Sequence, residues 1–389
     1  MKNKKKIVSI IVNSRANYAR IKSFLKYIHL SPIFELDLVV GASGLLYKYG
    51  EVAKIIEKDG FKISKKIYSV IEGGNHAAMA KTAGLGIIEL SSHFEKIKPN
   101  LVVVVADRYE NISIAIAASY LDIPLVHVQG GEVSGSIDEK VRHAITKLSD
   151  LHFVATERSK KFVEMMGENP KRVFVTGCPS LDLVKMKTYK FNRNLFLKTG
   201  VGGRNVVNKK KYVVVLQHPN TYEFSNTEKN ILETVKAVSR LDKKIGIIWL
   251  WPNIDAGTDV ISKVLRRFYE KNEKNNLYLC RNFEPEIFSK IIKNSLCLIG
   301  NSSSAIREGS FLGVPSVNIG TRQNLREIST NVINVDYKSS EILKAINFHI
   351  KNGHYMRSNL YGDGMSGKKM VDILSTVKIS TEKKLNYLL

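Results

Sequence analysis

The chain has 389 residues, of which 44% are hydrophobic, and an excess of lysine and arginine gives it a net charge of +24. This length suits two domains of ordinary size. No apolar run approaches the ~20 residues that span a membrane. The three cysteines are odd in number and far apart, so they predict neither a disulfide framework nor a zinc site. The basic start passes straight into a six-residue apolar run, which indicates a first strand and not a signal peptide; we expect a cytoplasmic protein.

The positive charge raises the possibility of nucleic-acid binding, because lysine and arginine supply non-specific affinity for phosphate. The excess is mostly lysine and is spread along the whole chain. Its densest run, 183–212, holds nine Lys and Arg residues and no acid. The sequence lacks helix-turn-helix, zinc-finger and RNA-recognition patterns. We therefore predict a lysine-rich solvated surface and no nucleic-acid partner, with a field that attracts small anions.

In the first half of the chain, short apolar runs alternate with amphipathic segments. The runs predict buried strands at 7–12, 35–41, 101–105, 124–128, 152–156 and from 173, and the segments between them predict helices near 21–28, 82–90, 109–121 and after 143. This alternation is typical of a parallel sheet with crossover helices. We predict an α/β fold whose first doubly wound domain covers 1–184.

A second α/β domain is predicted over 185–366, with strands starting at 212, 245, 277, 296 and 315. The stretch 185–211 lacks long periodicity and contains a glycine cluster at 200–203, which indicates a connection between the domains. Residues 367–389 have helix-like apolar spacing, and we expect them to pack back on the first domain.

Polar side chains follow two neighbouring strands of the first domain. Asp107 and Arg108 end one strand, while His127, Gln129 and Glu132 end the next. Parallel neighbours lie ~5 Å apart and ligands bind beyond their carboxyl ends, so these side chains can face one pocket.

Asp138 adds a third carboxylate to this region. Acids in such a place can have their proton affinities pushed apart, which provides one base and one acid. Alternatively, some of them pair with Arg108 or Arg142 as structural bridges. Their spacing fits no metal-ligand pattern, and we predict no metal.

Anion-binding features follow strands in both domains. Gly300–Ser304 precedes a helix, where hydroxyls and free amides can cradle a phosphate, and Glu308 can accept from ribose hydroxyls. Arg322 strengthens this interpretation, and Arg15 stands between a strand and a helix start. The alternatives are ordinary serine-capped helices and, for His218 at a strand end, a structural histidine.

Nine ordered motifs resemble those of the hydrolysing UDP-N-acetylglucosamine 2-epimerases, which include bacterial sialic-acid pathway enzymes and the epimerase half of an animal bifunctional enzyme. The motifs are 13–18, 106–109, 127–138, 142–148, 177–180, 217–219, 252–257, 300–304 and 320–323. The resemblance covers roughly residues 7–370. It implies a glycosyltransferase-B-like fold with two Rossmann-like domains and an active site between them.

The resemblance also implies the reaction. UDP leaves carbon 1, a carboxylate removes the hydrogen on carbon 2, and water then adds to the 2-acetamidoglucal to release N-acetylmannosamine for sialic-type acid synthesis. No cofactor is required, and the relatives imply a homodimer or homotetramer.

By motif matching, Asp107 and Asp138 fall on the family's functional acids. The positions expected to bind the UDP-sugar are Arg15, Arg108, His127, Gln129, His218, Asn253, Asp255, Asn282, Phe283, Ser302, Ser303, Glu308 and Arg322.

Two positions depart from the family. Many relatives have glutamate where this chain has Gln129, which cannot take a proton, so we expect Glu132 to inherit part of the catalytic role. Many also have histidine where this chain has Gly44, in a loop that would meet the sugar. The alternatives are therefore the same reaction on a UDP-2,4-diacetamido-2,4,6-trideoxyglucose of the legionaminic-acid route, or a glycosyltransferase of the same fold.

Overall fold

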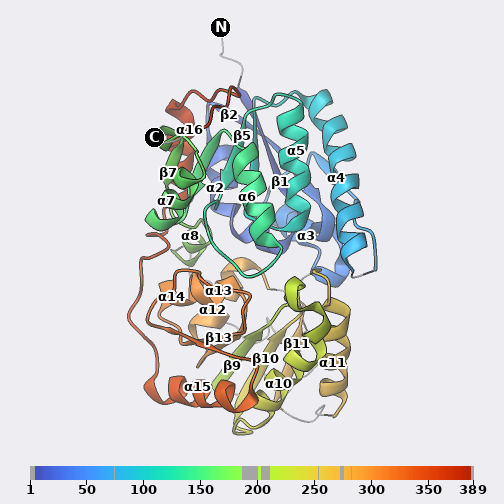
Figure 1. Cartoon of the computed structure of the whole chain (residues 1–389), viewed down its shortest axis with the longest axis vertical. Helices are drawn as coiled ribbons and strands as arrows, with labels where there is room; N and C mark the ends of the chain where they lie inside the picture. Colours follow the sequence, from blue (N-terminus) through green and yellow to red (C-terminus); the bar gives the residue numbers. More distant parts are fainter. Residues whose placement is uncertain are drawn as a thin grey trace. The chain divides into compact units, whose positions relative to one another are not determined.

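The computed structural model describes residues 5–73, 75–185, 200–202, 211–252, 254–271, 276–281 and 283–386. Contacts divide the chain into two compact units, both visible in Figure 1. The first unit comprises Met1–Glu132, Ile137–Lys185 and Tyr361–Leu389, and the second comprises Val133–Ser136 and Met186–Leu360.

The first unit is built on a parallel sheet with the strand order β3-β2-β1-β4-β5-β6-β7. Its strands are β1 Lys6–Val12, β2 Phe34–Gly41, β3 Lys65–Ile67, β4 Leu101–Val105, β5 Leu125–Val128, β6 Leu151–Val154 and β7 Val173–Val175. Its helices are α1 Arg15–Ala19, α2 Lys22–Leu30, α3 Val52–Lys58, α4 His76–Ile97, α5 Ile112–Tyr120, α6 Asp138–Leu148, α7 Glu157–Met165, α8 Ser180–Lys185 and α16 Ser366–Thr376. The order reverses between β1 and β4, so the carboxyl ends of these two strands flank a topological switch point.

Strand β4 shows why the central sheet is buried on both faces. Val103 and Val105 belong to one apolar cluster, and Val102 and Val104 belong to another. Successive side chains of a strand point to opposite faces, so a run of β-branched residues fills two cores at once.

The second unit has the strand order β14-β13-β12-β9-β10-β11-β8. Its strands are β8 Gly200–Gly202, β9 Lys211–Leu216, β10 Ile245–Leu250, β11 Leu277–Cys280, β12 Leu298–Gly300, β13 Ser316–Ile319 and β14 Val332–Val335. Its helices are α10 Thr227–Ser239, α11 Thr258–Lys271, α12 Pro285–Lys293, α13 Ser303–Ile306, α14 Glu308–Leu312 and α15 Ser339–Asn352. The predicted fold class, α/β with two doubly wound sheets, is confirmed.

Two segment predictions need correction. Gly200–Gly202 lies in the predicted connection but forms β8, which pairs antiparallel with β11; the rest of 186–210 lies outside the described residues. The helix predicted for about 367–389 is shorter: α16 spans Ser366–Thr376, and residues 377–386 contain no helix.

The side chain of Asp182 caps the start of α16, although it stands 184 residues before Ser366 in the sequence. Its carboxylate accepts from the amides of Ser366 at 2.9 Å and Gly367 at 2.7 Å, which satisfies two donors that a helix start leaves open. Gly367 permits close approach to α2, because an added Cβ would stand 2.6 Å from Ser23 Oγ. Within the described residues, no helix combines the length and apolar character needed to cross a membrane.

The turn after β5 requires glycine at Gly131. Its φ is +72°, and an added Cβ would overlap the carbonyl group of Ser159. Gly60 has a φ of +89° but open space around it. An alanine at Gly60 would thus meet only the conformational cost of a positive φ, whereas an alanine at Gly131 would also clash with Ser159.

We expect Gly60→Ala to cost about 1 kcal/mol of stability, from the left-handed conformation alone. Gly131→Ala should cost about 3 kcal/mol or more, because the α7 backbone must move. Equilibrium urea unfolding of both variants checks this difference. Equal losses would show that the Ser159 contact imposes no constraint.

Candidate active site

The carboxyl ends of β4 and β5 lie side by side because the strands pair in parallel, with Val105 opposite Val128. Each strand is followed by a non-glycine residue in the left-handed region, Ala106 at φ +60° and Gln129 at φ +70°. Such residues are uncommon and gather at functional sites. The turn at Ala106 leads directly into Asp107, the first of the predicted acids.

Arg142 of α6 joins the acids of this edge and is completely buried. Its guanidinium bonds Asp107 Oδ2 through Nε at 3.0 Å and through Nη2. Nη1 donates to the main-chain oxygen of Glu132 at 2.5 Å and to Glu139 Oε2 at 2.6 Å. Burial alone would lower the pKa of Arg142, but the charges of Asp107, Glu139 and Glu132 raise it above its usual value. Asp107 is therefore held in one position by a permanent cation.

The neighbouring arginines differ in their partners. Arg20 lies 3.9 Å from the second carboxylate oxygen of Asp107. Arg108, expected to bind substrate, is 5% exposed; its Nε donates to Glu110 at 2.7 Å and its guanidinium packs over the Tyr109 ring. Arg20 thus adds positive charge beside the acid, while Arg108 bonds within the protein.

Arg15 and Asp138 each begin a helix, and both are partly exposed. At the first helix, Ser14 Oγ accepts from the Asn17 amide at 3.2 Å, so a serine caps the helix that Arg15 begins. The Glu132 side chain is 4% exposed, which leaves Asp138 as the more accessible of these two carboxylates.

His127, predicted to bind substrate, is instead enclosed by the protein. It is fully buried, with Nε2 at 3.1 Å from the Ala106 carbonyl oxygen and Nδ1 at 3.1 Å from Thr146 Oγ1. Burial lowers the pKa of His127 to about 3, so the ring is neutral. A carbonyl only accepts, so Nε2 carries the hydrogen and Nδ1 accepts from the threonine hydroxyl.

Gln129 is also buried, and its Nε2 lies 2.7 Å from Cys178 Sγ. Cys178 Sγ in turn lies 3.0 Å from Ser180 Oγ. Gln129 therefore contacts a thiol inside the protein, where its amide can orient groups but cannot exchange a proton.

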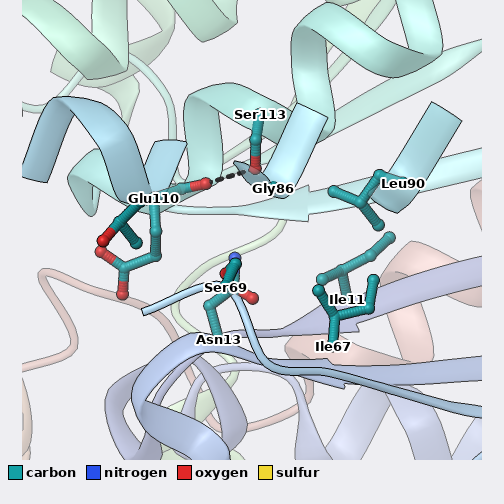
Figure 2. A pocket seen from close by; sticks show the side chains of 9 residues that line it. Ile11, Asn13, Ile67, Ser69, Gly86, Leu90, Glu110 and Ser113 are labelled. Atoms are coloured by element: carbon teal, nitrogen blue, oxygen red, sulfur yellow. Dashed lines mark hydrogen bonds between the residues drawn. The ribbon is translucent and has the colours of Figure 1, made fainter. Parts of the chain in front are cut away.

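A small cavity lies at the carboxyl ends of β1 and β3. Figure 2 shows Asn13 and Ser69 on one side of it and Glu110 and Ser113 on the other; the Ser113 hydroxyl donates to the Glu110 carbonyl at 2.7 Å. The cavity volume is about 10 Å³, close to the minimum for one water molecule. It is too small for a sugar ring.

In the second unit, Asn301 ties together the ends of β9 and β12. Its side chain accepts from the His218 amide at 2.8 Å and donates to the His218 carbonyl at 2.9 Å. The Asn301 carbonyl accepts from Gln323 Nε2 at 2.8 Å and from Arg322 Nη1 at 3.3 Å. Gly300, with a φ of +128°, permits this approach, because a Cβ there would overlap the Leu216 carbonyl.

The serine-rich turn after β12 has the geometry of a capped helix. Ser302 Oγ accepts from the Ser304 amide at 3.3 Å, and buried Arg307 donates to Ser303 Oγ at 3.4 Å. Glu308 begins α14 and is partly exposed. A helix cap and a phosphate cradle would thus use the same groups, the hydroxyls of Ser302 and Ser303 beside the positive charge of Arg307.

Arg322 also lies 3.8 Å from Asp255, which brings two predicted residues together. The preceding Thr321 is held by Asn220, which donates to its hydroxyl at 2.9 Å. Phe283 packs in an apolar core cluster and is 3% exposed, so its ring faces the interior. Two further predicted positions, Asn253 and Asn282, lie outside the described residues.

Sequence reasoning missed several organising residues. It weighed Arg142 only as a bridge, and it missed Arg20, Glu139, Asn301, Arg307 and Gln323. The available signal was position: Arg142 stands four residues after Asp138, and Asn301 stands directly after a strand-ending glycine. In the described part of the chain, no three His, Cys, Asp or Glu side chains gather as metal ligands.

Comparison with known proteins gives consistent matches along the chain. The profile of the UDP-N-acetylglucosamine 2-epimerase family matches residues 26–375. The chain is 33% identical over 379 residues to a UDP-N,N'-diacetylbacillosamine 2-epimerase (hydrolyzing) of Legionella pneumophila, with 96% of each chain covered. It is 27% identical over 385 residues to a UDP-N-acetylglucosamine 2-epimerase of Neisseria meningitidis, covering 97% of this chain and 98% of the relative.

The fold is similar to the crystal structure of UDP-GlcNAc 2-epimerase from Neisseria meningitidis bound to UDP-GlcNAc. The TM-score is 0.77 at 17% sequence identity, with 95% of this chain and 100% of the other covered.

The depressed pKa of His127 predicts a pH dependence of stability. The unfolded histidine takes a proton below pH 6.5 and the folded one only near pH 3, so stability present above pH 6.5 falls as the pH drops between these values. His127→Gln should remove up to about 1.4 kcal/mol per pH unit from that slope. Urea unfolding between pH 4 and 7 measures it, with exposed His76→Gln as the matched control. An unchanged slope in His127→Gln would contradict a neutral buried ring.

Proposed function

Because the chain belongs to the hydrolysing UDP-N-acetylglucosamine 2-epimerase family, we propose that it converts UDP-N-acetylglucosamine and water to N-acetylmannosamine and UDP. The observation that carries this proposal is the Asp107–Arg142 pair at the end of β4, on a motif that resembles the family's acids. The product would serve the synthesis of sialic-type acids.

The acid groups suit an elimination followed by a hydration. The bond between carbon 1 and the diphosphate oxygen breaks, UDP keeps the electron pair, and the hydrogen on carbon 2 leaves as a proton to a carboxylate. Arg142 favours the charged form of Asp107, as a base requires. Water then adds its hydroxyl at carbon 1 and a proton at carbon 2 from the opposite face, for which the accessible Asp138 and the buried Glu132 are the candidate donors.

The second unit supplies groups suited to UDP. Ser302, Ser303 and Arg322 can donate to the diphosphate, and Glu308 can accept from the ribose hydroxyls. Positive charge that is already in place stabilises the anion that develops as UDP departs, without reorganisation during the reaction. His218 is held by Asn301 at the same strand end and can donate to phosphate or sugar oxygens.

The same reaction on a UDP-diacetamido-trideoxyhexose is the second candidate, supported by the name of the Legionella relative and by two positions. Gln129 is an amide where a glutamate is common among relatives. Gly44 is tightly packed, since an added Cβ would lie 3.1 Å from Val40 and 3.2 Å from the Val12 oxygen. The position therefore has no room for a histidine side chain as it is packed here, so any contact that a histidine would make with the sugar is missing.

The deciding experiment is incubation of the purified protein with each UDP-sugar in water and no acceptor. Release of UDP with N-acetylmannosamine supports the first proposal, and release of a 2-epimeric diacetamido sugar supports the second; NMR identifies the product. A glycosyltransferase would consume donor only after an acceptor is added. Absence of UDP release from both sugars would refute both epimerase proposals.

Asp107→Asn should abolish UDP release while leaving the Kd for UDP within about twofold, because the variant removes the base and not the diphosphate donors. Arg142 keeps Glu139 and the Glu132 carbonyl as partners, so the variant should fold. Calorimetric titration with UDP and the UDP-release assay measure the two effects. Wild-type turnover by Asp107→Asn would remove this residue from the mechanism.

Arg322→Ala should show the complementary behaviour. Loss of a charged donor to the diphosphate should raise the Kd for UDP by about tenfold or more. The same titration measures it, with exposed Arg240→Ala as the control. Unchanged UDP affinity would place the diphosphate away from Arg322.

A further inference from the structure

Helix α6 is held at both ends by charged side chains. Its first turns carry Asp138 and Arg142, which belong to the candidate site. At its other end, α6 is contacted by Lys383, which stands 237 residues after Thr146 in the sequence. The function described above makes no use of Lys383.

Lys383 bonds to the carboxyl end of α6 in a favourable geometry. Its Nζ donates to the carbonyls of Thr146 at 3.1 Å and Ser149 at 2.5 Å. The last carbonyls of a helix lack partners within the helix, and a cation there also interacts favourably with the helix dipole. The Lys383 side chain is 24% exposed, so water competes only weakly for its hydrogen bonds to these carbonyls.

A buried carboxylate fixes the lysine in this position. Glu168 lies 2.8 Å from Lys383, 2.7 Å from Lys147 and 3.1 Å from His152. Burial would raise the pKa of Glu168, but hydrogen bonds from His152, Lys147 and Lys383 lower it to about 2. The carboxylate is therefore charged, and it links α6, β6 and the segment 377–386.

The segment 377–386 is attached on both sides of Lys383. Arg172 bonds the carbonyl of Lys378, and the amide of Asn386 donates to the carbonyl of Gly167 at 2.8 Å. The position of Lys383 is thus set by the first unit on either side of it.

Two routes lead from the carboxyl end of α6 to Asp107. In the first, Arg142 stands one turn before Thr146 on the same helix face and bonds Asp107. In the second, Thr146 donates to His127, and His127 donates to the carbonyl of Ala106, the left-handed residue before Asp107. A shift of α6 would therefore disturb the Asp107 carboxylate through its partner and through its backbone.

We propose that Lys383 is a positioning residue for the Asp107–Arg142 pair: it holds the carboxyl end of α6 from the segment 377–386 and so sets where the acid stands. This inference rests on the proposed function for its catalytic consequence. Lys383 touches no reacting group; it acts through α6.

The test compares Lys383→Met, Lys383→Arg and the control Lys384→Met, whose residue is exposed. Lys383→Met should lower kcat for UDP release about tenfold and leave KM and the Kd for UDP within about twofold. Lys383→Arg should restore most of kcat, because arginine can still donate to the helix carbonyls and Glu168. Lys384→Met should behave like the wild type. Circular dichroism at the assay temperature verifies that each variant is folded.

Hydrogen–deuterium exchange gives a readout that does not need activity. Amides of 142–148, which can donate within α6, should exchange faster in Lys383→Met than in the wild type or Lys384→Met. Unchanged exchange there overturns the proposal, even if the wild type releases no UDP and the proposed function fails. Faster exchange with unchanged kcat in an active enzyme also overturns it, since the helix would then be held without positioning the acid.

Discussion

The contact between Arg142 and Asp107 is the interaction on which the first unit's site depends. The arginine is completely buried, and its bonds reach the end of β4, the turn after β5 and its own helix. Removing the Asp107 side chain would cost up to about 3–5 kcal/mol, because the buried arginine would lose this carboxylate and keep that of Glu139. The Asp107→Asn variant retains an oxygen that can accept from Arg142. The pair therefore stabilises the packing of α6 against the ends of β4 and β5, in addition to any role in catalysis.

In both units, asparagine side chains bond main-chain groups at the ends of strands. In the first, Asn111 and Asn17 donate to the Val105 carbonyl at 2.6 and 3.1 Å, where β4 ends. In the second, Asn301 bonds both the amide and the carbonyl of His218. Strand ends have main-chain groups without ladder partners, and a short amide satisfies them while leaving room for a ligand.

Local pattern predicted the scaffold well and the side-chain roles less well. The run at β4 and the alternation around it predicted a parallel sheet, because burial on both faces demands β-branched residues in sequence. The ordered motifs predicted the family. By contrast, nothing local distinguishes His127 as a buried neutral ring, since its partners Thr146 and Ala106 come from other elements. The ring of Phe283 likewise faces the core because of α12 packing, and β8 is too short and glycine-rich to carry a strand pattern.

The two hydrogen bonds between the Asn301 side chain and the main chain of His218 have a consequence for how the second unit would bind a nucleotide. The side-chain amide bonds the main chain of His218, and the Asn301 carbonyl accepts from Arg322 and Gln323, so hydrogen bonds within the folded chain hold this turn. Immobilising a flexible side chain on binding costs about 0.5–1.5 kcal/mol, and a side chain that already bonds within the protein has less freedom to lose. If the diphosphate binds at this turn, as proposed, Arg322 and Gln323 would meet it already bonded to the chain that carries them.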